Sequence, residues 1–274
     1  MARIPFVPES EYPRAYEAAQ CVVETHRRLS AWLEPGQTLA HIDAFVGRTL
    51  EELGCKSCFR GYSPGRMPAF PSHACLSVNE CIVHGTAGYY EAPMKLGDVL
   101  KIDVGVWKQG WVGDAAWTYV FGPPTPEIKH LCDAGKDSIR EGVKTLRPGN
   151  TYRAWAETVQ RIVEHERGLH LVRGLGGHGY HKKRLHCEPF VANVLASFPG
   201  EWPDADREIR PGTIVAVEPM IAIGTNKTVQ KSGQWPIFTA DGSESVHYEH
   251  DVLITEEGPR VLTEGLEDIR DVIE

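Results

Sequence analysis

The sequence predicts an α+β fold in which helices pack beside antiparallel strands. Segments with apolar residues at helical spacing alternate with short runs rich in β-branched and aromatic residues, which glycines interrupt. Two segments of the first half of the chain recur in the second half. The 274 residues include 42% apolar and 24% charged residues, which is a globular composition, and this length allows one large or two small domains.

The expected elements follow one another in two similar rounds of helix and strand. The expected helices cover residues 11–33, 39–53, 126–146 and 151–167, and strands are expected over 74–122 and from 171 onward. Pro35-Gly36 stops the first helix, and Thr38 is placed to accept a hydrogen bond from the first turn of the second. Gly54 closes that second helix, and Thr151 is expected to begin the fourth in the way that Thr38 begins the second.

Two motifs recur at nearly the same spacing. Leu33-Glu-Pro-Gly-Gln-Thr38 recurs as Leu146-Arg-Pro-Gly-Asn-Thr151, and Gly97-Asp-Val-Leu-Lys-Ile-Asp103 recurs as Gly212-Thr-Ile-Val-Ala-Val-Glu218, with offsets of 113 and 115 residues. The agreement of the offsets predicts a pseudo-two-fold repeat with halves at about 30–122 and 145–256. Asp103 and Glu218 would then face each other. We expect a short N-terminal extension, 1–10, and one merged domain, 11–274.

Charge, hydropathy and cysteine usage narrow the function classes. The net charge of −8 argues against a strongly basic nucleic-acid surface. No apolar run approaches the roughly 20 residues of a membrane span, and the N-terminus lacks the apolar core of a secretory signal, so we expect a cytoplasmic protein. Seven cysteines, an odd number, favour reduced thiols. Cys55-Lys-Ser-Cys58 has the spacing of half a zinc site without a second half.

Two aspartates lie inside otherwise apolar strands. Asp103 belongs to the run 99–107, and Asp114 belongs to the run 111–121. If Lys108-Gln109 forms a two-residue turn, the two aspartates are directly opposed on one face, where like charges destabilise a sheet unless a cation lies between them. In the alternative register, one aspartate is a solvated edge residue.

Three further residues also combine a possible metal-binding side chain with apolar or glycine-rich surroundings. His178 lies among glycines, where backbones can approach closely, Glu218 ends an apolar strand, and Glu249 precedes one. Carboxylates in such apolar company are seldom buried unless they are paired or bind metal. Four carboxylates and one imidazole suit two adjacent divalent cations with open positions for water. The run Gly61-Tyr-Ser-Pro-Gly65 matches the nucleophile-elbow pattern, but Pro64 lacks the required N–H donor.

Taken together, these motifs resemble the type I methionine aminopeptidases. The matching segments, in order from about residue 10 to the C-terminus, are Asn79-Glu-Cys-Ile-Val-His84-Gly, Ile102-Asp103-Val, Gly113-Asp114, Gly177-His178-Gly, Glu218-Pro-Met and Tyr248-Glu249-His. The resemblance implies a pita-bread (creatinase/aminopeptidase) fold. It also implies an enzyme that removes the N-terminal methionine from nascent proteins with a small second residue, through a metal-bridged water or hydroxide that attacks the peptide carbonyl.

The resemblance also assigns roles. Asp114 and Glu249 would bridge two divalent metal ions, Asp103 would chelate one, and His178 and Glu218 would bind the other; the ions could be cobalt, manganese, iron or zinc. Glu218 would also accept a proton from the water, His84 would position the substrate, and His186 would hydrogen-bond the carbonyl and the oxyanion. The residues that would surround the methionine side chain, beside His84 and His186, are Tyr62, Phe70, Cys75, Leu185 and Trp235.

One segment departs from the family pattern. Between His178 and His186 the chain has one extra residue, Tyr180-His181 replaces Ile-Gly, and Cys187 replaces a glutamate, so His181 is a rival for the role of His186. About thirty residues separate His186 from Glu218, which leaves no room for the helical insertion of the type II enzymes. We expect residues 196–210 to form a surface loop.

Two alternatives remain open. A prolidase or aminopeptidase P would share the fold and the metal site but usually has a large N-terminal domain. A non-catalytic binding relative would be expected to lack metal ligands. The expected partners are the N-termini of nascent polypeptides, met at the ribosome, with no direct contact to nucleic acid or membrane, and we expect a monomer.

Overall fold

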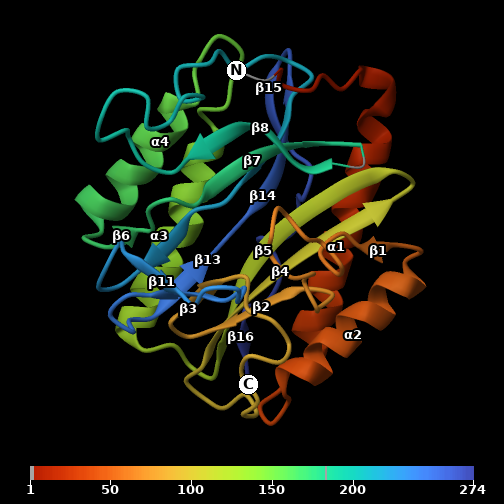
Figure 1. Cartoon of the computed structure of the whole chain (residues 1–274), viewed down its shortest axis with the longest axis vertical. Coiled ribbons are helices and arrows are strands. Elements are labelled where there is room, and N and C mark those ends of the chain that lie inside the picture. Colours follow the sequence, from red (N-terminus) through yellow and green to blue (C-terminus); the bar gives the residue numbers. More distant parts are fainter. Residues whose placement is uncertain (1–2, 183) are drawn as a thin grey trace.

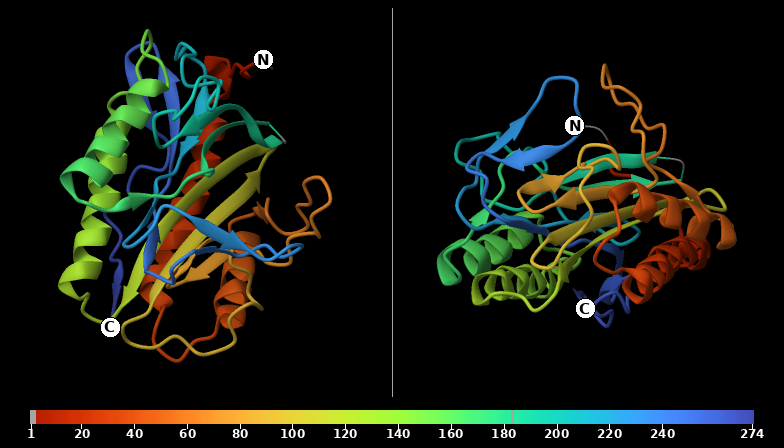
Figure 2. Two further views of the ribbon diagram at one scale, coloured as in Figure 1. Left: turned by 60° about the vertical axis from the view of Figure 1, so that its left-hand side comes forward. Right: turned by 90° about the horizontal axis from the view of Figure 1, so that it is seen from below.

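The computed structural model describes residues 3–182 and 184–274. Its four α-helices lie along one side of the strands, with α1 beside α2 and α3 beside α4 (Figures 1 and 2). The helices are α1 (Tyr12–Trp32), α2 (Leu39–Glu52), α3 (Pro126–Val143) and α4 (Arg153–Gln160), with a 3₁₀ turn η1 (Glu9–Glu11) and a π-helical turn η2 (Arg161–Glu166). The α+β fold that the sequence predicts is confirmed.

The strands form two five-stranded and two three-stranded sheets. One large sheet has the order β1-β4-β5-β16 with β2 also paired to β4, and the other has the order β15-β14-β9-β7-β8. The small sheets are β13-β10-β6 and β11-β12-β3. The strands are β1 (Lys56–Ser57), β2 (Cys75–Val78), β3 (Cys81–Val83), β4 (Val99–Lys108), β5 (Trp111–Phe121), β6 (His170–Leu171), β7 (Gly176–His181), β8 (Arg184–Ala192), β9 (Ile214–Val217), β10 (Met220–Ala222), β11 (Thr228–Gln230), β12 (Ile237–Thr239), β13 (Ser245–His247), β14 (His250–Thr255), β15 (Gly258–Val261) and β16 (Val272–Ile273).

Strand β5 lies at the centre of the molecule, and every one of its residues is buried. Helix α1 covers one face so closely that a Cβ atom on Gly113 would lie 2.6 Å from the backbone of Ala18. An edge of β5 meets the start of β14 in the second large sheet, because the N–H of Glu249 donates to Ala116 O over 2.9 Å. Residues of β5 are therefore placed to share one site with residues from the second half of the chain.

The register of the β4–β5 hairpin differs from the sequence prediction. The two turn residues are Gln109 and Gly110, both with positive φ (49° and 86°), instead of Lys108 and Gln109. Positive φ at both positions gives the primed turn that matches strand twist, and glycine adopts it without steric cost. Asp103 therefore pairs with Ala116, and Asp114 pairs with Gly105. Because the register shifts by two residues, the aspartates become diagonal neighbours but stay on one face.

The helix starts follow the sequence at Thr38 but not at Thr151. The Thr38 side chain accepts a hydrogen bond from the N–H of His41, as predicted, and Gly54 with φ of 65° ends that helix. Thr151 instead forms an isolated bridge with Glu208, and α4 begins at Arg153 without a side-chain cap. The fourth helix therefore starts at Arg153 and not at Thr151.

The repeated glycines have equivalent places, since Gly97 precedes β4 and Gly212 precedes β9, both with positive φ. The division into an extension, one domain and two halves stays a prediction, and residues 1–2 of the extension lie outside the described residues. Residues 196–210 form an irregular, largely exposed segment, as expected. The seven cysteines are free thiols. Within the described ranges, no helix is both long and apolar enough to cross a bilayer.

Candidate metal centre and substrate cavity

The five predicted metal ligands line one cavity. Asp103 comes from β4 and Asp114 from β5, while His178 lies on β7, Glu218 follows β9, and Glu249 precedes β14. The ligand atoms of Asp114, His178 and Glu249 lie within 4.8 Å of one another. His178 Nε2 is 3.8 Å from Asp114 Oδ2 and 3.7 Å from Glu218 Oε1. The structure thus brings together residues that are as far apart in the sequence as 103 and 249.

Glycines flank His178 because neighbouring backbones approach this part of β7 closely. A Cβ atom on Gly177 would lie 2.3 Å from Ala216 O, and one on Gly179 would lie 2.2 Å from Glu188 O. Both glycines are therefore required by neighbouring strands, which is the close approach that the sequence suggested. The result is a histidine held on a rigid strand between β8 and β9.

The electrostatics of these groups fit a divalent cation. Burial raises the pKa of Asp103 to about 8, with repulsion from Glu218 adding to it, and burial raises the pKa of Asp114 and Glu249 as well. Burial lowers the pKa of His178 to about 3 and keeps the imidazole neutral, as a ligand requires. Among the described residues, Asp103 Oδ1 and Asp114 Oδ1 are buried without a hydrogen-bond partner. Carboxylate oxygens with one imidazole are donors that such ions accept.

The raised pKa values predict how the metal-free protein responds to pH. A carboxyl group whose pKa is higher in the folded state adds stability below its unfolded pKa of about 4, and that contribution is lost as pH rises through the folded pKa. For Asp103 this window extends from about 4 to about 8. We therefore expect the free energy of unfolding of the metal-free protein, measured with urea, to fall between pH 5.5 and 8. Saturation with a divalent cation should flatten this dependence, and a metal-free protein equally stable at both pH values would contradict the assignment.

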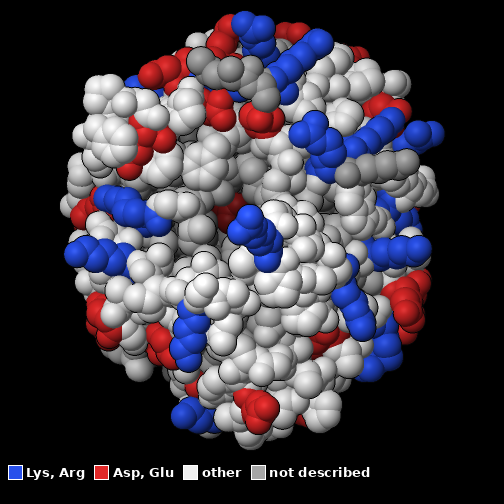
Figure 3. Space-filling view, viewed as in Figure 1, with Lys and Arg blue, Asp and Glu red and all other residues white. Residues whose placement is uncertain are grey.

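The same cavity, of about 180 Å³, contains every predicted substrate-contacting residue. They are Tyr62, Phe70, Cys75, His84, Leu185, His186 and Trp235, and Phe59 and Pro64 join them. The Phe70 and Trp235 rings meet edge to face at 5.2 Å, and Trp235 Nε1 donates to Pro68 O over 3.0 Å. These contacts fix the aromatic walls. Figure 3 shows acidic atoms at the bottom of a hollow near the middle of one face.

The two candidate histidines have different surroundings. His186 lies in the cavity, with its ring 4.4 Å from that of His178 and its Nδ1 2.8 Å from the Tyr62 hydroxyl. Its rival His181 instead packs edge to face on Trp111 at 5.5 Å. Two register irregularities between β7 and β8, on either side of Gly179, accommodate the unusual spacing, so that His186 still lies beside His178.

Two buried polar residues near the ligands, Asp251 and His247, are absent from the sequence prediction, and Tyr180 appears there only as a departure from the family pattern. Asp251 accepts the N–H of Asp114 over 2.8 Å, and His247 Nε2 lies 3.4 Å from Glu218 Oε2. Among the described residues, the Tyr180 hydroxyl is buried without a hydrogen-bond partner. Asp251 carries the signal that identified Asp103, namely a carboxylate inside an apolar strand, and could have been found by it. His247 and Tyr180 give no comparable sequence signal.

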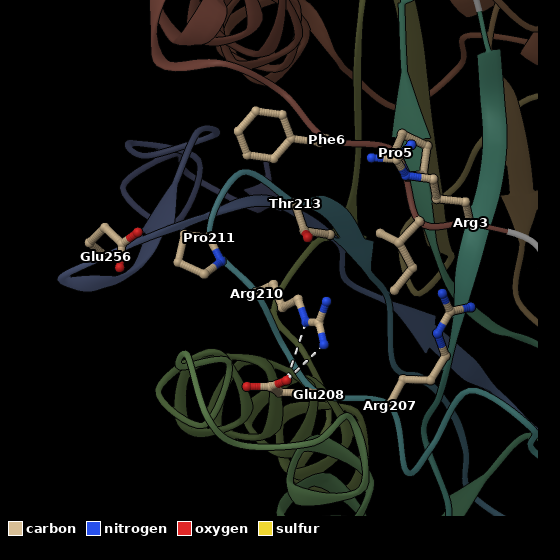
Figure 4. A pocket seen from close by; sticks show the side chains of 10 residues that line it. Arg3, Pro5, Phe6, Arg207, Glu208, Arg210, Pro211, Thr213 and Glu256 are labelled. Atoms are coloured by element: carbon tan, nitrogen blue, oxygen red, sulfur yellow. Dashed lines mark hydrogen bonds and ion pairs between the residues drawn. The ribbon is translucent and has the colours of Figure 1, made fainter.

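One further cavity adjoins the metal cavity, and another lies apart from it. A cleft of about 540 Å³ shares His84, His178, His186 and Glu218 with the metal cavity and extends it toward solvent. A separate cavity of about 760 Å³ lies between the N-terminal segment and residues 207–213 (Figure 4). Two of its arginines are paired, since Arg207 lies 2.8 Å from Asp204 and Arg210 lies 3.1 Å from Glu208. It therefore does not resemble a second catalytic centre.

Comparison with known proteins agrees with this geometry. The sequence matches metallopeptidase family M24 over residues 14–256. A methionine aminopeptidase of Aquifex aeolicus is 32% identical over 257 residues, which cover 93% of this chain and 97% of the relative. Methionine aminopeptidase 1 of Mycobacterium tuberculosis is 34% identical, with 90% of each chain covered.

Solved structures give the same result. The methionine aminopeptidase of Thermotoga maritima matches with a TM-score of 0.85 and 31% identity, covering 95% of this chain and 99% of that one. An X-Pro aminopeptidase from Thermotoga maritima shares the fold, with a TM-score of 0.73 and 17% identity, and this chain covers 63% of it. With the family match, the near-complete coverage by these relatives and the shared fold, the chain belongs to metallopeptidase family M24, among the methionine aminopeptidases with their pita-bread fold.

Proposed function

We propose that this chain is a metal-dependent aminopeptidase that removes the N-terminal methionine from polypeptides whose second residue is small. The observation that carries the proposal is the cavity of about 180 Å³, in which apolar side chains lie beside the ligand cluster. Its walls are aromatic, aliphatic and thiol groups without a charged group away from the ligands. An unbranched thioether fits such walls and gains sulfur–aromatic contacts of roughly 0.3 to 1.5 kcal/mol.

The proposed metal ligands are Asp103, Asp114, His178, Glu218 and Glu249, and the proposal includes two divalent ions, cobalt, manganese, iron or zinc. Bound ions of this kind lower the pKa of water and stabilise negative charge on the substrate carbonyl oxygen. Glu218 accepts a proton from the attacking water in this scheme. Its main-chain carbonyl accepts a hydrogen bond from Asn193 Nδ2 over 2.9 Å, which fixes the strand end that carries it.

The histidines contribute neutral hydrogen-bond donors. Burial lowers the pKa of His84 to about 4 and also lowers the pKa of His186, so both rings are uncharged near neutral pH. If the Tyr62 hydroxyl donates to His186 Nδ1, the ring proton is on Nε2. His186 can then donate to the carbonyl oxygen as charge develops on it, while His84 orients the substrate.

The proposal also covers the substrates, the cellular location and the oligomeric state. The substrates would be nascent chains in the cytoplasm, met at the ribosome, and the enzyme would act as a monomer with a pseudo-two-fold repeat. The rival activity, cleavage before proline, is represented among relatives that share the fold at 17% identity. A binding protein without activity is disfavoured because all five ligand positions hold side chains that can bind metal.

Specificity gives the direct test. We expect kcat/KM for Met-Ala-Ser to exceed that for Leu-Ala-Ser by about 10- to 200-fold, because γ-branching meets the narrow aromatic walls. Met-Arg-Ser should be cleaved poorly, since its second residue must lie beside the ligands. Leu185 stands where the family often has an aromatic residue, which widens the slot and places the leucine discrimination at the low end of the range.

The comparison should use one metal throughout and include Ala-Pro as the substrate of the rival activity. A preference for leucine, indifference to a bulky second residue, or faster cleavage of Ala-Pro would each overturn the proposed specificity. Absence of bound metal in a protein prepared with excess divalent ion would favour the binding-protein alternative.

A further inference from the structure

Lys101 is a lysine in the interior of the protein that the proposed mechanism does not use. It lies on β4, two residues before Asp103, and is 1% exposed. Its Nζ donates to the main-chain oxygen of Asn79 over 2.5 Å. An ammonium group removed from water is costly unless its surroundings compensate for the lost hydration. A buried lysine so close in sequence to a proposed metal ligand therefore needs a physical explanation.

The atoms around Lys101 belong to a tight turn. Asn79 lies between β2 and β3 with φ of 53°, a left-handed conformation that is unusual for a residue other than glycine. Its main-chain oxygen also accepts the Ser245 hydroxyl over 3.0 Å. Glu244 Oε2 is buried without a hydrogen-bond partner among the described residues, and Lys101 supplies positive charge near this carboxyl group. The Lys101 ammonium group thus lies near oxygen atoms of the Asn79 turn and of Glu244, which directly precedes β13.

The turn connects two strands, the arms β2 and β3, that both reach the cavity. Cys75 begins β2 and His84 follows β3, and both line the cavity beside the ligands. Strand β2 is fixed along β4, where Ser77 is paired directly with Lys101. Strand β3 instead pairs with β12 in another sheet, so the turn is one of the contacts that relate β3 to the sheet containing β4.

His84 itself is held in an unusual backbone conformation. Its φ is 58°, and the next residue, Gly85, is tied to β2 because its N–H donates to Ser77 Oγ over 3.0 Å. The arm that carries His84 is therefore fixed at Gly85 near one end and at Asn79 near the other. Left-handed conformations of this kind persist where surrounding contacts over-determine them.

We propose that Lys101 is a positioning residue for His84, acting through the Asn79 turn. Its ammonium group holds the Asn79 carbonyl against β4, which fixes the start of β3 and aims the His84 ring into the cavity. The inference rests on the proposed function for the role of His84, but the position of the ring can be measured without any substrate.

The test compares Lys101→Ala with a matched control, Lys108→Ala. Lys108 lies on the same strand, and its Nζ also donates to a main-chain oxygen, that of Leu53, over 2.5 Å. It is not among the residues that line the cavity. Both variants lose one ammonium-to-carbonyl contact. We expect Lys101→Ala to lower kcat/KM for Met-Ala-Ser by on the order of 10- to 100-fold, as misplacement of a substrate-positioning group does, and Lys108→Ala to change it by less than about twofold.

A double-mutant cycle separates positioning from a general structural role. In a His84→Asn background, Lys101→Ala should cost less than about twofold, because the group through which it acts is already gone. The same loss in both backgrounds would show that Lys101 acts on the fold or on the ligands, and would overturn the inference. Bound metal per chain should equal that of the parent.

The position of the His84 ring can be measured even in a variant that has no activity. The NMR signals of the His84 ring should move in Lys101→Ala, stay in place in Lys108→Ala, and return when n-propylammonium, which replaces the deleted atoms, is added; n-propanol is the neutral control. Unmoved His84 signals would overturn the inference. If the alanine variant does not fold, Lys101→Met should be used instead, because methionine keeps much of the volume of the lysine side chain without its charge. The same His84 ring signals are then measured. A parent enzyme that cleaves no Met peptide would instead contradict the proposed function.

Discussion

Replacing Asp114 with asparagine is expected to abolish peptide hydrolysis while the fold persists. Asp114 lies at the centre of the cluster, with its ligand atom among those within 4.8 Å of His178 and Glu249. The loss in metal affinity should exceed the roughly 10- to 100-fold that removal of an outer-shell partner costs, because a direct donor is removed. Metal titration by calorimetry and kcat/KM for Met-Ala-Ser measure the two effects.

The same substitution should stabilise the metal-free protein near pH 8. Burial and the neighbouring Asp103 raise the pKa of Asp114, so its ionisation opposes folding as pH rises. An amide of the same shape removes that opposition. The exposed Asp133, which pairs with Lys129 on helix α3, gives the matched control Asp133→Asn, which should change neither activity nor the pH dependence. An Asp114→Asn variant that hydrolysed peptides like the parent would show that Asp114 is not a ligand.

Removal of metal by chelation is expected to reduce activity to background, and addition of Mn²⁺ or Co²⁺ should restore it. The physical reason is that five groups from two sheets converge on one point, whereas no serine or thiol in the cavity has the surroundings of a nucleophile. Ser63, in the discarded nucleophile-elbow pattern, donates its hydroxyl to Met67 O over 2.6 Å in an exposed loop.

The matched control for this experiment is Ser63→Ala, which should retain the activity of the metal-loaded parent. Metal content must be measured in each sample. Full activity in a sample verified to be free of metal would refute the assignment of the cluster, whatever the specificity for methionine.

The sequence predicted that the five proposed ligands lie together, as their shared cavity shows, but it predicted the wrong register between Asp103 and Asp114. Each of the four carboxylates could be recognised because it lies in or beside an apolar strand, where an unpaired charge is costly. The hairpin register was wrong because a two-residue turn can be placed at Lys108-Gln109 or at Gln109-Gly110, and the positive φ of both latter residues decides between them. Both aspartates still lie on one face of the sheet, because side chains alternate between the faces and the register differs from the prediction by two residues.

Long-range pairing accounts for the other differences. Thr151 has the sequence of an N-cap, but its backbone pairs with Glu208, a partner that no local pattern reveals. Asp251 on β14 accepts the N–H of Asp114 on β5, a contact that becomes apparent once these strands are known to be neighbours. The position of His186 depended on two strand irregularities that absorb the unusual spacing, and spacing alone could not choose between it and His181.

The buried carboxylates have a consequence for how long the protein lasts. A protein whose folded state accumulates unfavourable negative charge without its ion, and binds the ion strongly, gains stability in proportion to the logarithm of the free ion concentration. Scarcity of the divalent ion would thus increase the unfolded fraction that proteases degrade. Starvation for metal would reduce the number of enzyme molecules as well as the activity of each, so that supply of the ion would set the abundance of the protein.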